Sequence, residues 1–205
     1  LPNIWNAHCG FKYERKFNEL KALSQKYFTF GSLNNFMKIS DETIDAWSMI
    51  LTKVKNSILI LKSSNFCNEE ILMNKFKSNG VEDKIKILRK ANFLKHEDHL
   101  NLYKNIDLCL DTFPYNGVTT TFEALWMNVP VIVLKGNNFV SRCGESINTN
   151  LGNTNFIAVD DDDYIIKAIS INENKEKLLE FRSTIRDKAK KTPLFNNEVF
   201  CKEFY

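Results

Sequence analysis

Short apolar runs alternate with amphipathic helical patterns along most of this chain, and this alternation constrains the fold more than any other feature. The runs 57–61 (SILIL) and 130–134 (PVIVL) are continuous, which is typical of strands that are covered on both faces. The pattern predicts further strands at 27–32, 84–88, 106–110 and 156–159, and helices at 40–54, 68–79, 96–104, 119–127, 141–148 and 161–191. Short connections between such elements indicate an α/β fold, a parallel sheet with helices on both faces.

The two ends of the chain are less regular than its middle. The chain begins at Leu1 without a Met or a signal peptide, so we expect residues 1–26 to be a connector from a missing amino-terminal region, docked as a helix. Residues 27–191 would form the α/β domain, and residues 192–205 a carboxyl-terminal helix packed on it.

Charge and composition exclude several classes of protein. The chain has 28 basic and 25 acidic residues, a balance that does not favour nucleic-acid binding. It contains no apolar run of about 18 residues that could span a membrane. The 5 cysteines lie far apart without a C-x-x-C pair, so we expect no zinc site, a core role for Cys109 and a cytoplasmic location. The acidic run 160–163 is either a helix start or part of a metal site, and it lacks an evident closing ligand.

In open parallel sheets, ligands bind beyond the carboxyl ends of the strands, so the loops at 31–39, 89–98, 111–119 and 135–141 are the candidates. The loop at 111–119 is the most informative. Asn116-Gly117 tolerates a positive φ, and Thr119-Thr120-Thr121 opens a helix. A helix start offers free N–H groups and the positive end of a dipole, which suits a diphosphate. The alternative is a plain threonine N-cap, of which the helix needs only one.

The other candidate side chains also have two interpretations each. Lys38 either points over the sheet edge toward the same crevice or is solvated. His99 either belongs to the site or caps its short helix, and His96 beside it does not make a metal site in the absence of carboxylate partners. Ser141 is expected to be an N-cap, and Arg142 either braces the crevice or pairs with an acid.

Three segments in this order, FGSLNNFMKIS, LDTFPYNGVTTTFEALWMNVPVIVL and SRCGES, resemble the O-linked N-acetylglucosamine transferase and SPINDLY-like glycosyltransferases of family 41. The resemblance covers about 27–200, and it implies a Rossmann-like, GT-B carboxyl-terminal domain that binds a UDP-sugar. It also implies that an amino-terminal half with the acceptor side is missing, often preceded by helical repeats.

The resemblance assigns roles to individual positions. Lys38 matches the essential lysine, Asn35 a Gln or Asn near the phosphates, and Thr119 and Thr120 the diphosphate-binding helix start, with Gly117 and Thr121 beside it. On the nucleoside side, His99 matches a site histidine, Glu123 an acidic residue that meets the ribose, and Phe93 and Leu94 residues whose backbone meets the uracil. No metal or other cofactor is implied.

Three departures from the family pattern stand out. Val118 replaces a His that contacts phosphate in animal members, Leu102 replaces an Arg that packs on the base, and the acceptor half is absent. We expect the donor-binding domain of an inverting, metal-independent glycosyltransferase that transfers a sugar from UDP to a protein or other acceptor, with the domain alone inactive. The alternatives are a non-catalytic nucleotide-binding or assembly module and another UDP-sugar enzyme of the same fold, such as an epimerase.

Overall fold

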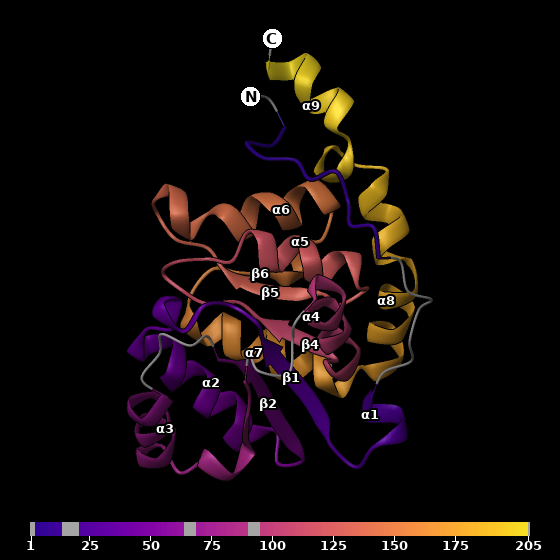
Figure 1. Ribbon diagram of the computed structural model, residues 1–205. Coiled ribbons are helices and arrows are strands. Elements are labelled where there is room, and N and C mark those ends of the chain that lie inside the picture. Colours follow the sequence, from indigo (N-terminus) through magenta and orange to yellow (C-terminus); the bar gives the residue numbers. More distant parts are fainter. Residues whose placement is uncertain (1–2, 14–20, 64–68, 90–94, 205) are drawn as a thin grey trace.

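A computed structural model of the chain describes residues 3–13, 21–63, 69–89 and 95–204 (Figure 1). In this part of the chain, six parallel strands form one sheet in the order β3-β2-β1-β4-β5-β6. The strands are β1 (Phe28–Ser32), β2 (Ser57–Lys62), β3 (Ile85–Leu88), β4 (Leu108–Leu110), β5 (Val131–Leu134) and β6 (Ile157–Ala158). The prediction of a parallel sheet in an α/β fold is confirmed.

Helices cover both faces of the sheet (Figure 1). They are α1 (Lys21–Ser24), α2 (Asp41–Lys53), α3 (Glu69–Ser78), α4 (His96–Leu102), α5 (Thr119–Trp126), α6 (Cys143–Leu151), α7 (Asp161–Glu173), α8 (Lys175–Lys190) and α9 (Asn197–Phe204). Two of the predicted starts are confirmed in detail. Ser40 caps α2 by accepting from Thr43 N, and Asp160 caps α7 by accepting from Asp163 N, so the acidic run is a helix start.

The strands divide their side chains between two cores because successive residues of a strand point to opposite faces. In β4, Leu108 and Leu110 pack with residues of α2, α3 and α7, whereas Cys109 packs with residues of α4 and α5 on the other face. Ile132 of β5 joins the first core, and Val131 and Val133 join the second. This division explains why the strands are apolar at consecutive positions.

The order of the strands reverses between β1 and β4. From β1 the chain continues to β2 on one side, and it later returns to place β4 on the other side of β1. In open sheets, the loops after the two strands at such a reversal leave in opposite directions, and ligands bind in the crevice between the carboxyl ends of those strands. The crevice is thus expected between the loop at 33–40 and the loop at 111–118.

A buried arginine secures the opposite end of β4. Arg182 of α8 is 2% exposed, and its Nη1 donates to the carbonyl oxygens of Ile106 and Asp107 at 2.7 and 2.6 Å. Burial lowers the pKa of Arg182 to about 10, while the nearby Asp107 acts in the opposite direction. Sequence analysis assigned 161–191 to helices with polar faces and did not foresee this buried charge.

The two ends of the described chain lie near each other (Figure 1). Residues 3–13 dock without a helix, contrary to the expectation for this region: Ile4 is buried, and His8 N donates to Leu194 O. The side chain of Asn3 donates to Glu203 of α9. The short helix η7 (Pro193–Phe195) connects α8 to α9.

Two predictions from composition concern membranes and thiols. Across the described residues, every helix is too short or too polar to cross a membrane. Cys109 is a buried free thiol, as predicted, and burial raises its pKa. Cys9, Cys143 and Cys201 are also free thiols, and Cys67 lies outside the described residues.

Candidate functional site

The loop after β1 places a lysine in the crevice. The helix η1 (Phe36–Lys38) ends at Lys38, whose Nζ donates to Asn116 O at 2.9 Å and lies 4.1 Å from the ring centroid of Tyr115. Partial burial lowers the pKa of Lys38, and the neighbouring Asp111 opposes this effect. Of the two interpretations of Lys38, the structure supports the one in which it points toward the loop after β4.

The two asparagines of the same loop have different surroundings. Asn35 is exposed and its Oδ1 accepts from Met37 N at 3.0 Å, which caps η1. Asn34 is buried, its Nδ2 donates to Asp111 Oδ1 at 3.0 Å, and its Oδ1 accepts from the Thr120 hydroxyl at 2.6 Å. The structure therefore brings Asn34, rather than the predicted Asn35, to the start of α5. The family resemblance assigned Asn35 and gave no signal for Asn34, and the role of Asn35 near the phosphates stays a prediction.

The loop after β4 is held by hydrogen bonds that its own polar residues make. Asn116 Nδ2 donates to Thr112 O at 3.0 Å, and Asn116 Oδ1 accepts from Gly144 N at 3.2 Å. The hydroxyls of Ser40 and Thr43 both donate to Phe113 O, at 2.8 and 2.7 Å. The loop is consequently fixed to both α2 and α6, and it presents its backbone to the crevice in one conformation.

Gly117 is required for space rather than for backbone conformation. Asn116 and Gly117 tolerate a positive φ, but neither residue adopts one. A Cβ atom at Gly117 would lie 2.5 Å from Thr120 Oγ1, 2.7 Å from Asn34 Oδ1 and 2.9 Å from Asp111 Oδ1. These four residues and Lys38 form what we call the Gly117 cradle, and the absence of a side chain at its centre lets both loops meet there.

The three threonines occupy the first turn of α5, and none of them caps it. The N-cap position belongs to Val118, which makes no capping hydrogen bond, so the alternative of a plain threonine N-cap is wrong. Thr121 is buried and donates to Gly117 O at 3.2 Å, while Thr120 donates to Asn34. Thr119 is exposed. Because no side chain caps this end, the helix presents its first N–H groups and its positive dipole end beside the Gly117 cradle.

Asp111 is the buried acid of the cradle, and sequence analysis did not single it out as a site residue. It is 1% exposed, and its Oδ1 accepts from Gly117 N at 2.8 Å, Thr112 N at 2.9 Å and Asn34 Nδ2 at 3.0 Å. Its Oδ2 is buried and has no hydrogen-bond partner among the described residues. Burial raises the pKa of Asp111 to about 7, although these hydrogen bonds and Lys38 favour the charged form.

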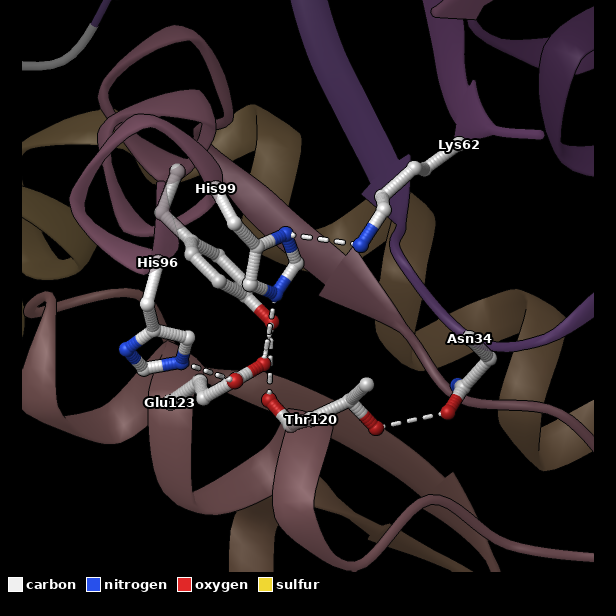
Figure 2. A network of polar contacts seen from close by, with 7 residues as sticks. Asn34, Lys62, His96, His99, Thr120 and Glu123 are labelled. Carbon is white, nitrogen blue, oxygen red and sulfur yellow. Dashed lines mark hydrogen bonds and ion pairs between the residues drawn. The ribbon is translucent and has the colours of Figure 1, made fainter. Parts of the chain in front are cut away.

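On the nucleoside side of the predicted site, Glu123 holds both histidines of α4 (Figure 2). Its carboxylate lies 3.1 Å from His96 Nε2 and 2.8 Å from His99 Nε2, and it accepts from the Tyr103 hydroxyl at 3.3 Å. Burial favours the neutral acid, but the histidine contacts outweigh it, and the pKa of Glu123 lies below its usual range. The histidines therefore have the carboxylate partner that sequence analysis did not find.

Lys62 contacts the other ring nitrogen of His99. Lys62 Nζ lies 3.0 Å from His99 Nδ1, and an ammonium group can only donate, so Nδ1 accepts and Nε2 carries the proton given to Glu123. His99 is buried and Lys95 occupies the N-cap position of α4, so His99 does not cap this helix. The Tyr103 hydroxyl also lies 3.0 Å from Thr120 O, which connects this cluster to the start of α5.

The remaining predicted positions are distributed as follows. Phe93 and Leu94 lie outside the described residues, and Leu102 is buried in the core. Ser141 ends the helix η5 (Phe139–Ser141) and does not cap α6, since Asn138 caps η5 and Arg142 precedes α6. Arg142 pairs with Glu145 at 2.7 Å instead of bracing the crevice. Within the described ranges, no group of three or more His, Cys, Asp or Glu side chains is arranged to hold a metal ion.

Comparison with known proteins agrees with this geometry. The family model described as glycosyl transferase family 41 matches residues 18–204. The chain is 35% identical over 185 residues to a probable UDP-N-acetylglucosamine–peptide N-acetylglucosaminyltransferase SPINDLY of Eustoma exaltatum subsp. russellianum, covering 89% of this chain and 20% of the relative. It is 34% identical over 205 residues to the SPINDLY protein of Solanum lycopersicum, covering 98% and 22% respectively. The chain thus spans about a fifth of the length of these relatives.

Solved structures show the same fold. A mutant of the O-GlcNAc transferase of Thermobaculum terrenum aligns with a TM-score of 0.78 and 26% identity, covering 88% of this chain and 36% of that one. WaaG, a glycosyltransferase of lipopolysaccharide biosynthesis, aligns with a TM-score of 0.60 and 15% identity over 87% of this chain and 50% of its own, which shows the GT-B fold alone. The match of the family model over residues 18–204 and the identity to the SPINDLY relatives show that the chain belongs to glycosyltransferase family 41.

Proposed function

We propose that this chain binds the diphosphate of a UDP-sugar in the Gly117 cradle and serves as the donor-binding part of an O-GlcNAc transferase-type enzyme. The observation that carries the proposal is the hydrogen bond from Lys38 Nζ to Asn116 O at 2.9 Å. It holds an ammonium group beside the uncapped start of α5, so two sources of positive potential meet at one point. The names of the relatives, which specify UDP-N-acetylglucosamine, support UDP-N-acetylglucosamine or a UDP-hexose as the donor.

The proposed chemistry is inverting transfer of the sugar to a hydroxyl or amide of a protein or other acceptor. As the bond from the sugar to the diphosphate breaks, negative charge develops on the UDP leaving group. Lys38 and the backbone N–H groups of Thr119 and Thr120 would stabilise this charge by preorganised electrostatics. This source of stabilisation requires no metal ion, and we propose a metal-independent reaction for that reason.

On the nucleoside side, we propose that the ribose and base lie toward α4, with Glu123 and His99 at the ribose. The Glu123 carboxylate already accepts from two histidines and a tyrosine, so a ribose hydroxyl would share an oxygen with one of them. A GT-B site lies between two domains, so the 205-residue chain alone should bind UDP weakly and transfer no sugar. The acceptor groups would come from a preceding domain in the parent protein.

The proposal can be tested by titrating the chain with UDP, with ADP as the control nucleotide, followed by NMR. Lys38→Ala should weaken UDP binding by about ten- to a hundredfold, the range for losing a hydrogen bond between charged groups. Lys55→Ala is the matched control, because Lys55 is exposed and precedes β2 at the opposite end of the sheet. Equal affinity for UDP and ADP, or unchanged UDP binding in Lys38→Ala, would contradict the assignment.

A further inference from the structure

The carboxylate of Asp111 joins the two walls of the Gly117 cradle. One oxygen, Oδ1, accepts from Asn34 Nδ2 on the β1 side and from Gly117 N and Thr112 N on the β4 side. Through Asn34, whose other amide atom accepts from the Thr120 hydroxyl, the same carboxylate orients the first turn of α5. Asp111 and Asn34 together thus connect the loops after β1 and β4 to the start of α5.

The second oxygen has the opposite surroundings. Oδ2 is buried without a hydrogen-bond partner in the described part of the chain, and a Cβ atom at Gly144 would lie 3.2 Å from it. A buried carboxylate costs free energy when one of its oxygens receives no hydrogen bond. Protonation of that oxygen removes the charge and therefore the cost. Oδ1 is saturated by three donors, so a proton would be carried by Oδ2.

We propose that Asp111 is a positioning residue of the diphosphate site, which aligns both walls through Oδ1 and takes up a proton at Oδ2 when a diphosphate enters. The inference rests on the proposed function of the cradle. One proton moves from solvent to Oδ2, the negative charge of Asp111 is neutralised, and no other bond forms or breaks. The cradle then holds the anionic ligand without an opposing carboxylate beneath it.

The groups that face Asp111 from the surrounding elements are consistent with this role. They are Lys38 of η1, Cys143 of α6, Tyr164 of α7, Tyr103 before β4 and Cys109 of β4 itself. Burial raises the pKa of each of these thiols and phenols, so they are neutral near pH 7. Lys38 is the cation that favours ionised Asp111, and a bound diphosphate would share that cation while adding negative charge of its own.

The test uses the 205-residue chain, UDP-N-acetylglucosamine as the probe and Asp111→Asn as the variant. The two phosphates of this probe each carry a single ionised oxygen, so the ligand itself does not titrate near neutral pH. The introduced amide can keep Oδ1 as the acceptor of three hydrogen bonds while placing an uncharged nitrogen where Oδ2 lies, so the variant removes the titration and retains the geometry. The ¹³C resonance of the Asp111 carboxyl, identified by its loss in the variant, reports protonation directly.

The expected result is a carboxyl that titrates near pH 7 in the free chain and at a higher pH when the probe is bound. By linkage, affinity should then fall roughly fivefold between about pH 6 and about pH 8.5 in the wild type. The corresponding change in Asp111→Asn should be smaller, because the variant lacks the carboxyl whose proton uptake is linked to binding.

Other outcomes overturn the inference in distinguishable ways. If the probe binds but leaves the Asp111 titration unchanged or moves it to lower pH, Asp111 takes up no proton and the inference fails while the proposed function stands. Should Asp111→Asn not fold, the wild-type titration with and without the probe decides the question alone. Failure of the wild type to bind the probe at any pH would overturn the proposed function, and the inference with it.

Discussion

Replacing Asp111 by Asn should change how the stability of the chain depends on pH. The pKa of Asp111 rises from 3.8 to about 7 on folding because the carboxyl is buried. Between these values the folded chain keeps a proton that the unfolded chain has released, so the free energy of unfolding falls as pH rises from about 4 through 7. At pH 8 the accumulated cost of ionising Asp111 in the fold amounts to about 4 kcal/mol.

The amide that Asp111→Asn introduces does not titrate, so the variant should lack this loss. The free energy of unfolding, measured by urea titration at several pH values, should rise in the variant relative to the wild type by about 4 kcal/mol between pH 4 and pH 8. The constant part of the difference, which includes the cost of an unpaired amide, does not affect this slope. A difference between the two proteins that is independent of pH would refute the reasoning.

Asp163 provides a control with the opposite sign. Its contact with Lys167, at 2.6 Å, and its hydrogen bond from Val159 N lower its pKa. Its contribution is therefore present above pH 4 and is lost as pH falls below that value. The Asp163→Asn variant should accordingly differ from the wild type by a nearly constant amount between pH 4 and pH 8, which separates the Asp111 effect from general acid sensitivity.

Three further predictions concern the site and its support. Gly117→Ala should cost about 1–3 kcal/mol of stability and weaken UDP binding, because the new Cβ displaces Asn34 and Thr120; unaltered UDP affinity would argue against the cradle as the ligand site. An excess of chelator should leave UDP affinity unchanged in the same titration, and a tenfold loss would reveal a required cation. Arg182→Ala should cost about 3 kcal/mol in urea unfolding because it leaves two buried carbonyls unpaired, while Arg142→Ala on the surface has little effect, and equal effects would show that burial is not decisive.

The apolar runs were sufficient to predict the fold, because a strand covered on both faces has few alternatives. All six strands appear where continuous apolar residues predicted them, within a residue or two at their ends. The loops could be located for the same reason, since the order of the strands determines which carboxyl ends are adjacent. This argument located the start of α5 as a candidate site, whereas it left Lys38 between the crevice and solvent until the contact with Asn116 O decided the question.

The details of the loops depended on contacts that the sequence does not encode locally. Whether Asn34 or Asn35 enters the cradle is decided by the path of the backbone after β1, and both residues suit a turn. The carboxylate partner of His96 and His99 lies on α5, so it becomes visible only when two helices are packed. Asp111 was overlooked because an acid at the end of a strand is ordinarily solvated, whereas here it is buried by three elements.

The junction of β1 and β4 has a mechanical consequence. β1 pairs with β2 over five residues but with β4 over only two, Phe30 with Leu108 and Gly31 with Cys109, and β4 pairs with β5 over two as well, so few backbone hydrogen bonds cross the β1–β4 junction. At one end of this junction, Asn34 and Lys38 make hydrogen bonds to Asp111 and Asn116, which follow β4. Asp107 bridges it at the other end, where it accepts from Thr29 N at 2.9 Å.

The side chains of the Gly117 cradle therefore also connect the half of the domain that contains β1–β3 to the half that contains β4–β6. A nucleotide bound across the β1–β4 junction would add further contacts between the two halves. The two halves would then unfold together over a wider range of denaturant concentration. A mutation that removed these contacts would weaken the coupling between β1–β3 and β4–β6 before it unfolded either half. If the proposed nucleotide binds there, the atoms that hold it are the same ones that connect the two parts of the sheet.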